Sequence, residues 1–137
     1  MKLEYKSHEI YKGKKELNGL PATFGDENEC TSLEITCEDT YLNLQVVLVY
    51  TTFENLDVIT RSVKVKNLSE DKINLTKVLS TCIDFDDIDY DMISLHGSWA
   101  RERHVQRKKI GYGKQVVSTI RGESSHQDNP FIALLDS

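Results

Sequence analysis

The sequence has few cysteines and no long apolar run. The three cysteines, Cys30, Cys37 and Cys82, cannot all pair with one another, and none belongs to a Cys-x-x-Cys motif. This usage is typical of reduced thiols in a cytoplasmic protein and not of a disulfide framework. The longest stretch without a charged residue, residues 40–53, contains two polar amides and is too short to span a bilayer.

The N-terminal residues do not resemble a signal peptide, and basic residues are not in surplus. Charged or polar residues at Lys2, Glu4, Lys6 and His8 interrupt any apolar run at the N-terminus. The chain has 17 Lys and Arg against 22 Asp and Glu, a formal net charge of −5. This balance provides no electrostatic reason to bind nucleic acid or an anionic membrane. We therefore expect a cytoplasmic protein with neither of these partners.

What is present is an ordinary globular composition with a period of two. The 137 residues are 39% hydrophobic and 28% charged, which suits one folded domain with a core. One weak strand is expected among the polar first thirty residues, and turn residues occupy 67–72. Alternating apolar residues predict further strands at 33–37, 42–50, 58–65, 73–79, 115–120 and 131–135. Short turns and the lack of a convincing helix predict an all-β, antiparallel β-sandwich, with residues 1–137 as part of a single domain.

An acidic run, Asp84-Phe-Asp-Asp-Ile-Asp-Tyr-Asp91, is the most conspicuous charged segment. Its carboxylates could hold calcium or supply the acid and the nucleophile of a glycosidase. A calcium loop counted from Asp87 fails, because its sixth position is Met92 instead of Gly and its twelfth is Ser98 instead of Glu. The simpler interpretation is a solvated strand end or turn.

The segment 96–104, His-Gly-Ser-Trp-Ala-Arg-Glu-Arg-His, contains the only tryptophan, Trp99. An aromatic ring beside fork-shaped donors such as Arg101 and Arg103 suits a sugar, which has an apolar face and a rim of hydroxyls. Taken alone, a residue such as Trp99 is more often a core or interface residue than a sugar ligand. His96 and His104 have no acidic or Cys partner at metal spacing, so no metal site is expected.

Two more segments have a functional and a structural interpretation. The basic stretch 101–109 could bind phosphate, but no aromatic residues interleave with it and the rest of the chain is acidic. A solvated strand edge or subunit contact is therefore the simpler interpretation. In 121–131, Ser124, Ser125 and His126 suggest a hydrolase. Adjacent residues rarely form a triad, however, so a tight turn before a strand is the simpler interpretation.

The order of these segments carries more information than any one of them. Five blocks occur in the same order as in the bacterial raffinose- and melibiose-cleaving α-galactosidases of glycoside hydrolase family 36, which this chain resembles. The blocks are Leu20-Pro-Ala-Thr23, Asp57–Val63 with Asn67, Leu95–His104, Arg121–His126 and Asn129-Pro-Phe131. The resemblance runs from about Leu20 to Leu135, and the block at 95–104 is its most specific part.

The resemblance implies a galactose-mutarotase-like β-sandwich that precedes a catalytic (β/α)8 barrel. Members hydrolyse terminal α-galactosides with retention, using two barrel aspartates that have no counterpart here. The resemblance therefore implies no catalytic residue in this chain, no cofactor and no metal, and predicts that the chain is inactive alone. It implies that Trp99 lines the galactose subsite, and that the parent protein is a homo-oligomer, a tetramer in this family.

Other functions remain open from the sequence. A stand-alone carbohydrate-binding or scaffold module could reuse the same sandwich, because a fold alone does not determine function. An α-N-acetylgalactosaminidase or a galactosyl transferase would also fit, since the residues that set specificity lie mostly in the barrel.

Overall fold

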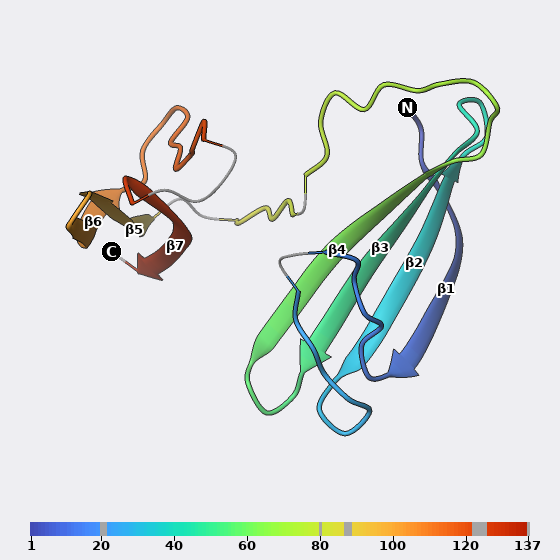
Figure 1. The fold of residues 1–137 in the computed structure, drawn as a ribbon, viewed down its shortest axis with the longest axis horizontal. Helices are drawn as coiled ribbons and strands as arrows, with labels where there is room; N and C mark the ends of the chain where they lie inside the picture. Colours follow the sequence, from blue (N-terminus) through green and yellow to red (C-terminus); the bar gives the residue numbers. More distant parts are fainter. Residues whose placement is uncertain (20–21, 80, 87–88, 122–125, 137) are drawn as a thin grey trace. The chain divides into compact units, whose positions relative to one another are not determined.

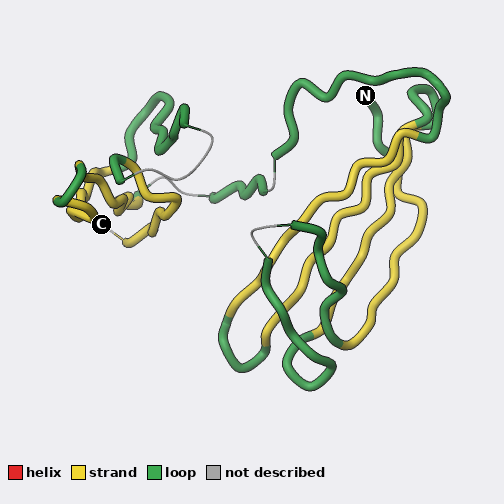
Figure 2. Tube along the Cα trace, viewed as in Figure 1, coloured by secondary structure: helices red, strands yellow, loops and turns green. Residues whose placement is uncertain are grey.

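The computed structural model describes residues 1–19, 22–79, 81–86, 89–121 and 126–136. These residues form antiparallel strands and loops without a helix, as Figure 2 shows. None of them belongs to a helix that could cross a membrane. The predicted all-β, antiparallel class is confirmed. The chain divides into two compact units, Met1–Cys82 and Ile83–Ser137, which are described separately below.

The first unit is a four-stranded antiparallel sheet. Its strands follow one another in chain order across the sheet (Figure 1). They are β1 (Glu4–Lys12), β2 (Thr31–Asp39), β3 (Leu44–Phe53) and β4 (Val58–Asn67). The weak strand expected near the N-terminus and the strands expected from residues 33, 42 and 58 onward are therefore confirmed.

The β2–β3 turn is organised by one carboxylate. Asp39 accepts hydrogen bonds from the backbone N–H groups of Lys2, Tyr41 and Leu42, at 2.6, 3.0 and 2.9 Å. These bonds, led by the one from Leu42, favour the charged form and lower the pKa of Asp39. Asn43 closes the turn at a φ of 50°, a conformation that Asn tolerates better than most residues.

The two faces of this sheet differ in character. Because β3 pairs with both neighbours without a register shift, alternate residues stay on one face from strand to strand. One face is apolar: Val46 is buried, but Ile10 and Ile59 are 64% and 66% exposed. The same face carries the half-buried side chains Leu33, Ile35, Leu48, Val63 and Val65. This face has the composition of the inner face of a sandwich layer.

The opposite face is covered at one end by the segment between β1 and β2. This segment crosses the sheet in Figure 1. The Ser32 hydroxyl donates to the carbonyl oxygen of Gly13 at 2.6 Å and also lies 2.8 Å from the Thr51 hydroxyl. Both hydroxyl residues are fully buried. A polar pair that satisfies itself in this way fixes the segment to the sheet without leaving an unpaired donor.

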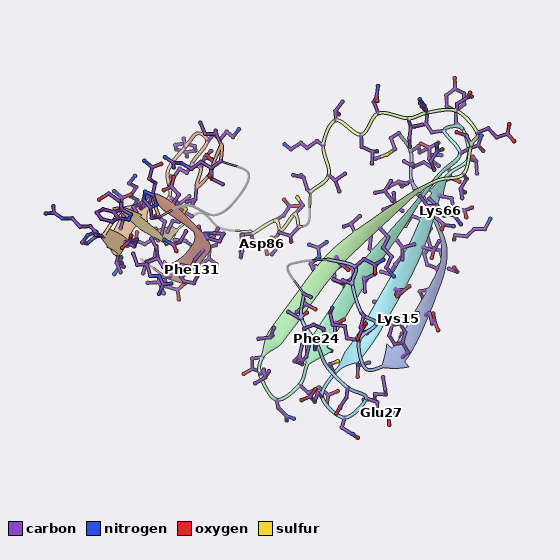
Figure 3. The ribbon with its side chains drawn as sticks, in the orientation of Figure 1. Lys15, Phe24, Glu27, Lys66, Asp86 and Phe131 are labelled. Carbon is purple, nitrogen blue, oxygen red and sulfur yellow. The ribbon has the colours of Figure 1, made fainter. Side chains whose placement is uncertain are left out.

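Glu34 joins three parts of the same face. Its carboxylate accepts a hydrogen bond from the Tyr11 hydroxyl at 2.9 Å and lies 3.3 Å from Lys64 and 3.4 Å from Lys15. Lys15 also lies 4.2 Å from the centre of the Tyr11 ring, and Figure 3 shows it over the sheet. Burial raises the pKa of Glu34, but the hydrogen bonds from Tyr11 and Lys64 outweigh it, and the net pKa is lowered.

The second unit is a three-stranded antiparallel sheet. Its central strand, β5 (Tyr90–Ser98), pairs with β6 (Arg101–Lys109) on one side and with β7 (Asp128–Asp136) on the other. The strand expected at 131–135 is confirmed, but it begins earlier. Asn129 and Pro130, expected in a turn, lie inside β7 next to a register shift, where a missing N–H is tolerated.

Two predicted strands are wrong. Residues 73–79 and 115–120 have no strand structure. Ile73 and Leu75 line a cavity of about 370 Å³ together with Leu44. Alternating apolar residues therefore do not form a strand by themselves, because a strand also requires a partner for its backbone N–H and C=O groups.

We predict that Glu34 makes stability pH-dependent. Because its pKa is lower in the folded than in the unfolded chain, its contribution is present above about pH 4.3 and is lost as the pH falls through the folded-state value. Glu34→Gln should therefore reduce the unfolding free energy at pH 7 and change it much less at pH 3. Urea denaturation at both values measures this.

Glu54→Gln is the matched control for this experiment. Glu54 is 72% exposed and 3.8 Å from Lys12, a pair expected to contribute little. An equal loss in both variants, or a loss at Glu34 that does not depend on pH, would contradict the prediction.

Candidate functional site

Trp99 lies at the tip of the β5–β6 hairpin. Ser98 and Arg101 are paired across the two strands, so Trp99 and Ala100 form the two-residue connection. The Trp99 side chain is 81% exposed, and Arg101 and Arg103 are exposed beside it in sequence. In this structure Trp99 is therefore not a core residue. The tip presents an open aromatic surface, and the exposed strand that follows it carries Arg101 and Arg103.

One residue of the turn and one of the following strand have backbone conformations that residues with a side chain rarely adopt. Ala100 has a φ of 62° and Arg103 a φ of 64°. For a residue with a Cβ this region costs roughly 1–2 kcal/mol. The Glu102 carboxylate offsets part of the cost, because it accepts a hydrogen bond from the Ala100 N–H at 2.8 Å. Unfavourable backbone at an exposed tip is a common feature of functional sites.

Gly97 is required by the close approach of β6. A Cβ built on Gly97 would lie 2.4 Å from the carbonyl oxygen of Arg101 and 2.7 Å from the Cα of Glu102. The strand pairing shifts register beside Gly97, so the glycine sits in a bulge where the backbones come together. Its N–H donates to the carbonyl oxygen of Gln127 at 3.0 Å, which ties the hairpin to the start of β7.

The structure places the two histidines of this segment directly opposite each other, His96 on β5 and His104 on β6. His96 is engaged by other groups. Its Nε2 lies 2.7 Å from the Ser94 hydroxyl, and its Nδ1 lies 2.5 Å from a carboxylate oxygen of Asp128. Within the described ranges, no three His, Cys, Asp or Glu side chains form a group that could hold a metal ion.

The acidic and basic segments meet each other. Lys109 Nζ lies 2.8 Å from Asp89, and Arg107 Nε lies 2.5 Å from Asp91. The hydrogen bond to Asp89 raises the pKa of Lys109. The basic stretch forms the edge strand β6, and every residue of this strand is exposed. This agrees with its interpretation as a solvated strand edge. The two runs compensate each other's charge across one hairpin.

The rest of the acidic run does not form a site in the described residues. Asp84 and Asp86 are exposed, and Figure 3 labels Asp86. Asp87, from which a calcium loop was counted, lies outside the described residues. Ser124 and Ser125, from the segment 121–131, also lie outside the described residues. His126 is described, and its carbonyl oxygen would lie 3.0 Å from a Cβ on Gly97.

The sequence did not reveal the partners of His96. Ser94 lies two residues before it and Asp128 lies 32 residues after it. No spacing rule connects these positions, because β7 reaches β5 only through the tertiary fold and through a register shift. The His96-Asp128 pairing has no local sequence signal.

Comparison with known proteins identifies the family. Residues 1–137 match the family described as the glycosyl hydrolase family 36 N-terminal domain. The chain is 48% identical over 134 residues to the α-galactosidase AgaA of Geobacillus stearothermophilus. This match covers 97% of the chain and 18% of the relative, so the chain spans less than a fifth of the length of that relative.

Solved structures agree with this match. The crystal structure of the family 36 α-galactosidase AgaB from Geobacillus stearothermophilus superposes with a TM-score of 0.95 at 46% identity. A variant of AgaA in complex with raffinose also superposes with a TM-score of 0.95, at 47% identity. Each of these matches covers 98% of this chain and 19% of the solved one. The predicted resemblance and the β-sandwich fold are confirmed.

We predict that Gly97→Ala destabilises the second unit. The new methyl group would meet backbone atoms of Arg101 and Glu102, which cannot rotate away, and such overpacking costs about 1–3 kcal/mol. Gly111→Ala is the control, since a Cβ there meets nothing within 4 Å. Thermal melting followed by circular dichroism compares the two. Equal melting temperatures would show that the hairpin backbones can separate without cost.

Proposed function

The chain belongs to the N-terminal domain family of the family 36 glycosyl hydrolases, and from this premise we propose that it is a non-catalytic part of a retaining α-galactosidase. In this proposal it contributes Trp99 to one wall of the galactose subsite. The single observation that carries the proposal is the 81% exposure of Trp99 at the tip of a hairpin, within the most specific block of the resemblance, residues 95–104.

The carboxyls of this chain support a non-catalytic role. A retaining glycosidase needs two carboxyl groups about 5–5.5 Å apart, and the one that acts as acid has a raised pKa. Three described carboxyls have a pKa below the ordinary value. Hydrogen bonds lower the pKa of Glu34 and Glu38, and backbone N–H groups lower that of Asp39. Such groups stay ionised and are poor general acids.

Trp99 suits the apolar face of a sugar. Its ring is exposed and lies in a turn that is restrained by the Gly97 approach and by the Glu102 bond to Ala100. Arg101 and Arg103 add donors for sugar hydroxyls at the rim. Because the ring is solvated before binding, covering it with a sugar removes apolar surface from water.

Three further features belong to the same proposal. We propose that the sandwich is galactose-mutarotase-like, that the enzyme is a cytoplasmic homo-oligomer, and that Trp99 serves the barrel of a neighbouring subunit. The exposed position of Trp99 at a hairpin tip supports the last point, because such a residue can reach a second chain. The substrate class is a terminal α-galactoside of the kind that raffinose represents.

We predict that the purified 137-residue chain does not hydrolyse a chromogenic α-galactoside above background. In the complete enzyme, Asp84→Asn and Asp86→Asn should leave kcat nearly unchanged. Both carboxylates are exposed, whereas a catalytic acid lies in a pocket that raises its pKa. A loss of about a thousandfold, equivalent to about 4 kcal/mol, would instead assign the chemistry to the acidic run.

We predict that Trp99→Ala in the complete enzyme lowers kcat/KM by about 5- to 150-fold, since an aromatic platform is worth roughly 1–3 kcal/mol. The melting temperature should hardly change, because an exposed side chain fills no core. Trp99→Phe keeps a ring and should lose less. Steady-state kinetics and thermal melting measure both effects.

Tyr112→Ala is the matched control, as Tyr112 is a 99% exposed aromatic residue of the same unit outside the hairpin. A fall in melting temperature with normal kinetics in Trp99→Ala would make Trp99 structural and would remove the subsite from the proposal. If the chain instead binds galactosides by itself, as measured by titration calorimetry, the stand-alone module would be favoured.

A further inference from the structure

Three side chains behind the hairpin tip form a continuous hydrogen-bonded relay. The Ser94 hydroxyl lies 2.7 Å from Nε2 of His96, and Nδ1 of His96 lies 2.5 Å from Oδ1 of Asp128. Ser94 and His96 are on the central strand β5, and Asp128 is the first residue of β7. His96 and Asp128 are also direct partners in the strand pairing.

The direction of these bonds follows from their chemistry. An ionised carboxylate only accepts, so Nδ1 of His96 must carry the proton that it donates to Asp128. In the neutral ring, Nε2 is then an acceptor and receives the Ser94 hydroxyl proton. The relay therefore fixes both the tautomer and the orientation of the imidazole.

Ser94, His96 and Asp128 are connected in the same order as the residues of a hydrolytic triad, but the serine is buried. Ser94 is only 1% exposed, so its oxygen cannot reach a substrate. A nucleophile must meet the reacting carbon at van der Waals distance, and a buried hydroxyl on a central strand does not. The relay is better suited to holding structure than to attacking a bond.

What the relay holds is the base of the Trp99 hairpin. The next residue after His96 is Gly97, whose N–H donates to the carbonyl oxygen of Gln127, the residue before Asp128. The side chains of His96 and Asp128 thus form one tie between β5 and the start of β7. The backbones of the adjacent residues Gly97 and Gln127 form a second. Both ties lie beside the bulge at Gly97 and the turn that carries Trp99.

We propose that Ser94, His96 and Asp128 are positioning residues that orient the Trp99 ring for sugar binding. This inference rests on the proposed function of Trp99. The side-chain tie at His96 prevents the hairpin from pivoting on β7, and a ring held in one orientation binds a sugar face without losing freedom on binding. Misplacement of a platform by about 1 Å is enough to reduce catalysis substantially.

The test uses Asp128→Ala, which removes the acceptor, and Asp128→Asn, which keeps an oxygen for Nδ1. In the complete enzyme, Asp128→Ala should lower kcat/KM for a chromogenic α-galactoside by about 3- to 30-fold, less than Trp99→Ala, with substantial recovery in Asp128→Asn. His104→Ala is the matched control, because His104 lies opposite His96 on the exposed strand β6.

A double-mutant cycle separates positioning from general damage. If the relay acts through Trp99, Asp128→Ala should have no further effect on kcat/KM when Trp99 is already Ala. An equal loss with and without Trp99 would overturn the proposal. If Asp128→Ala lowers the melting temperature below the assay temperature, Ser94→Ala, which removes the other partner of His96, takes its place in the cycle.

A second readout does not depend on activity. Trp99 is the only tryptophan of the 137-residue chain, so its fluorescence anisotropy decay reports the motion of the hairpin tip alone. Asp128→Ala should increase the amplitude of fast motion, and His104→Ala should not. An unchanged decay would overturn the relay. If Trp99→Ala leaves the kinetics normal while the decay changes, the relay holds and the subsite proposal fails.

Discussion

The close approach of the Arg101 carbonyl oxygen to Gly97 is the contact on which the proposed site depends. Only a residue without a Cβ lets the two backbones meet there, and the resulting bulge turns the hairpin into its tip. The left-handed Ala100 and the Glu102 carboxylate then close the turn. Gly97, Ala100 and Glu102 therefore act together to hold the turn that exposes Trp99.

Charge complementarity explains the most conspicuous feature of the composition. An acidic run and a basic run stand out in the sequence as two separate candidate sites. In the structure, Asp89 and Asp91 pair with Lys109 and Arg107 across β5 and β6. Exposed pairs of this kind contribute little stability, but like charges in the same places would oppose the hairpin. Charges along the edge strand also discourage pairing with another chain.

The four-stranded sheet has one face with paired polar groups and one apolar face. On the face with Glu34, Ser32 and Thr51, Ser32 binds Gly13 of the segment between β1 and β2, and the other polar groups pair across the strands. The other face is apolar and only half-buried in the first unit, as Ile10 and Ile59 illustrate. In a family whose members continue well beyond the length of this chain, such a face is suited to packing against further protein.

The sequence by itself determined the fold class and most strands, because alternation and turn residues act locally. It predicted the long β3 and the following β4 well, but it failed for residues 73–79, where alternation lacked a backbone partner. Trp99 was found through resemblance to a family. Only the tertiary structure decided that Trp99 is exposed and that His96 meets Asp128, 32 residues away. The physical reason is that a strand's partner and register depend on long-range pairing, which no local pattern encodes.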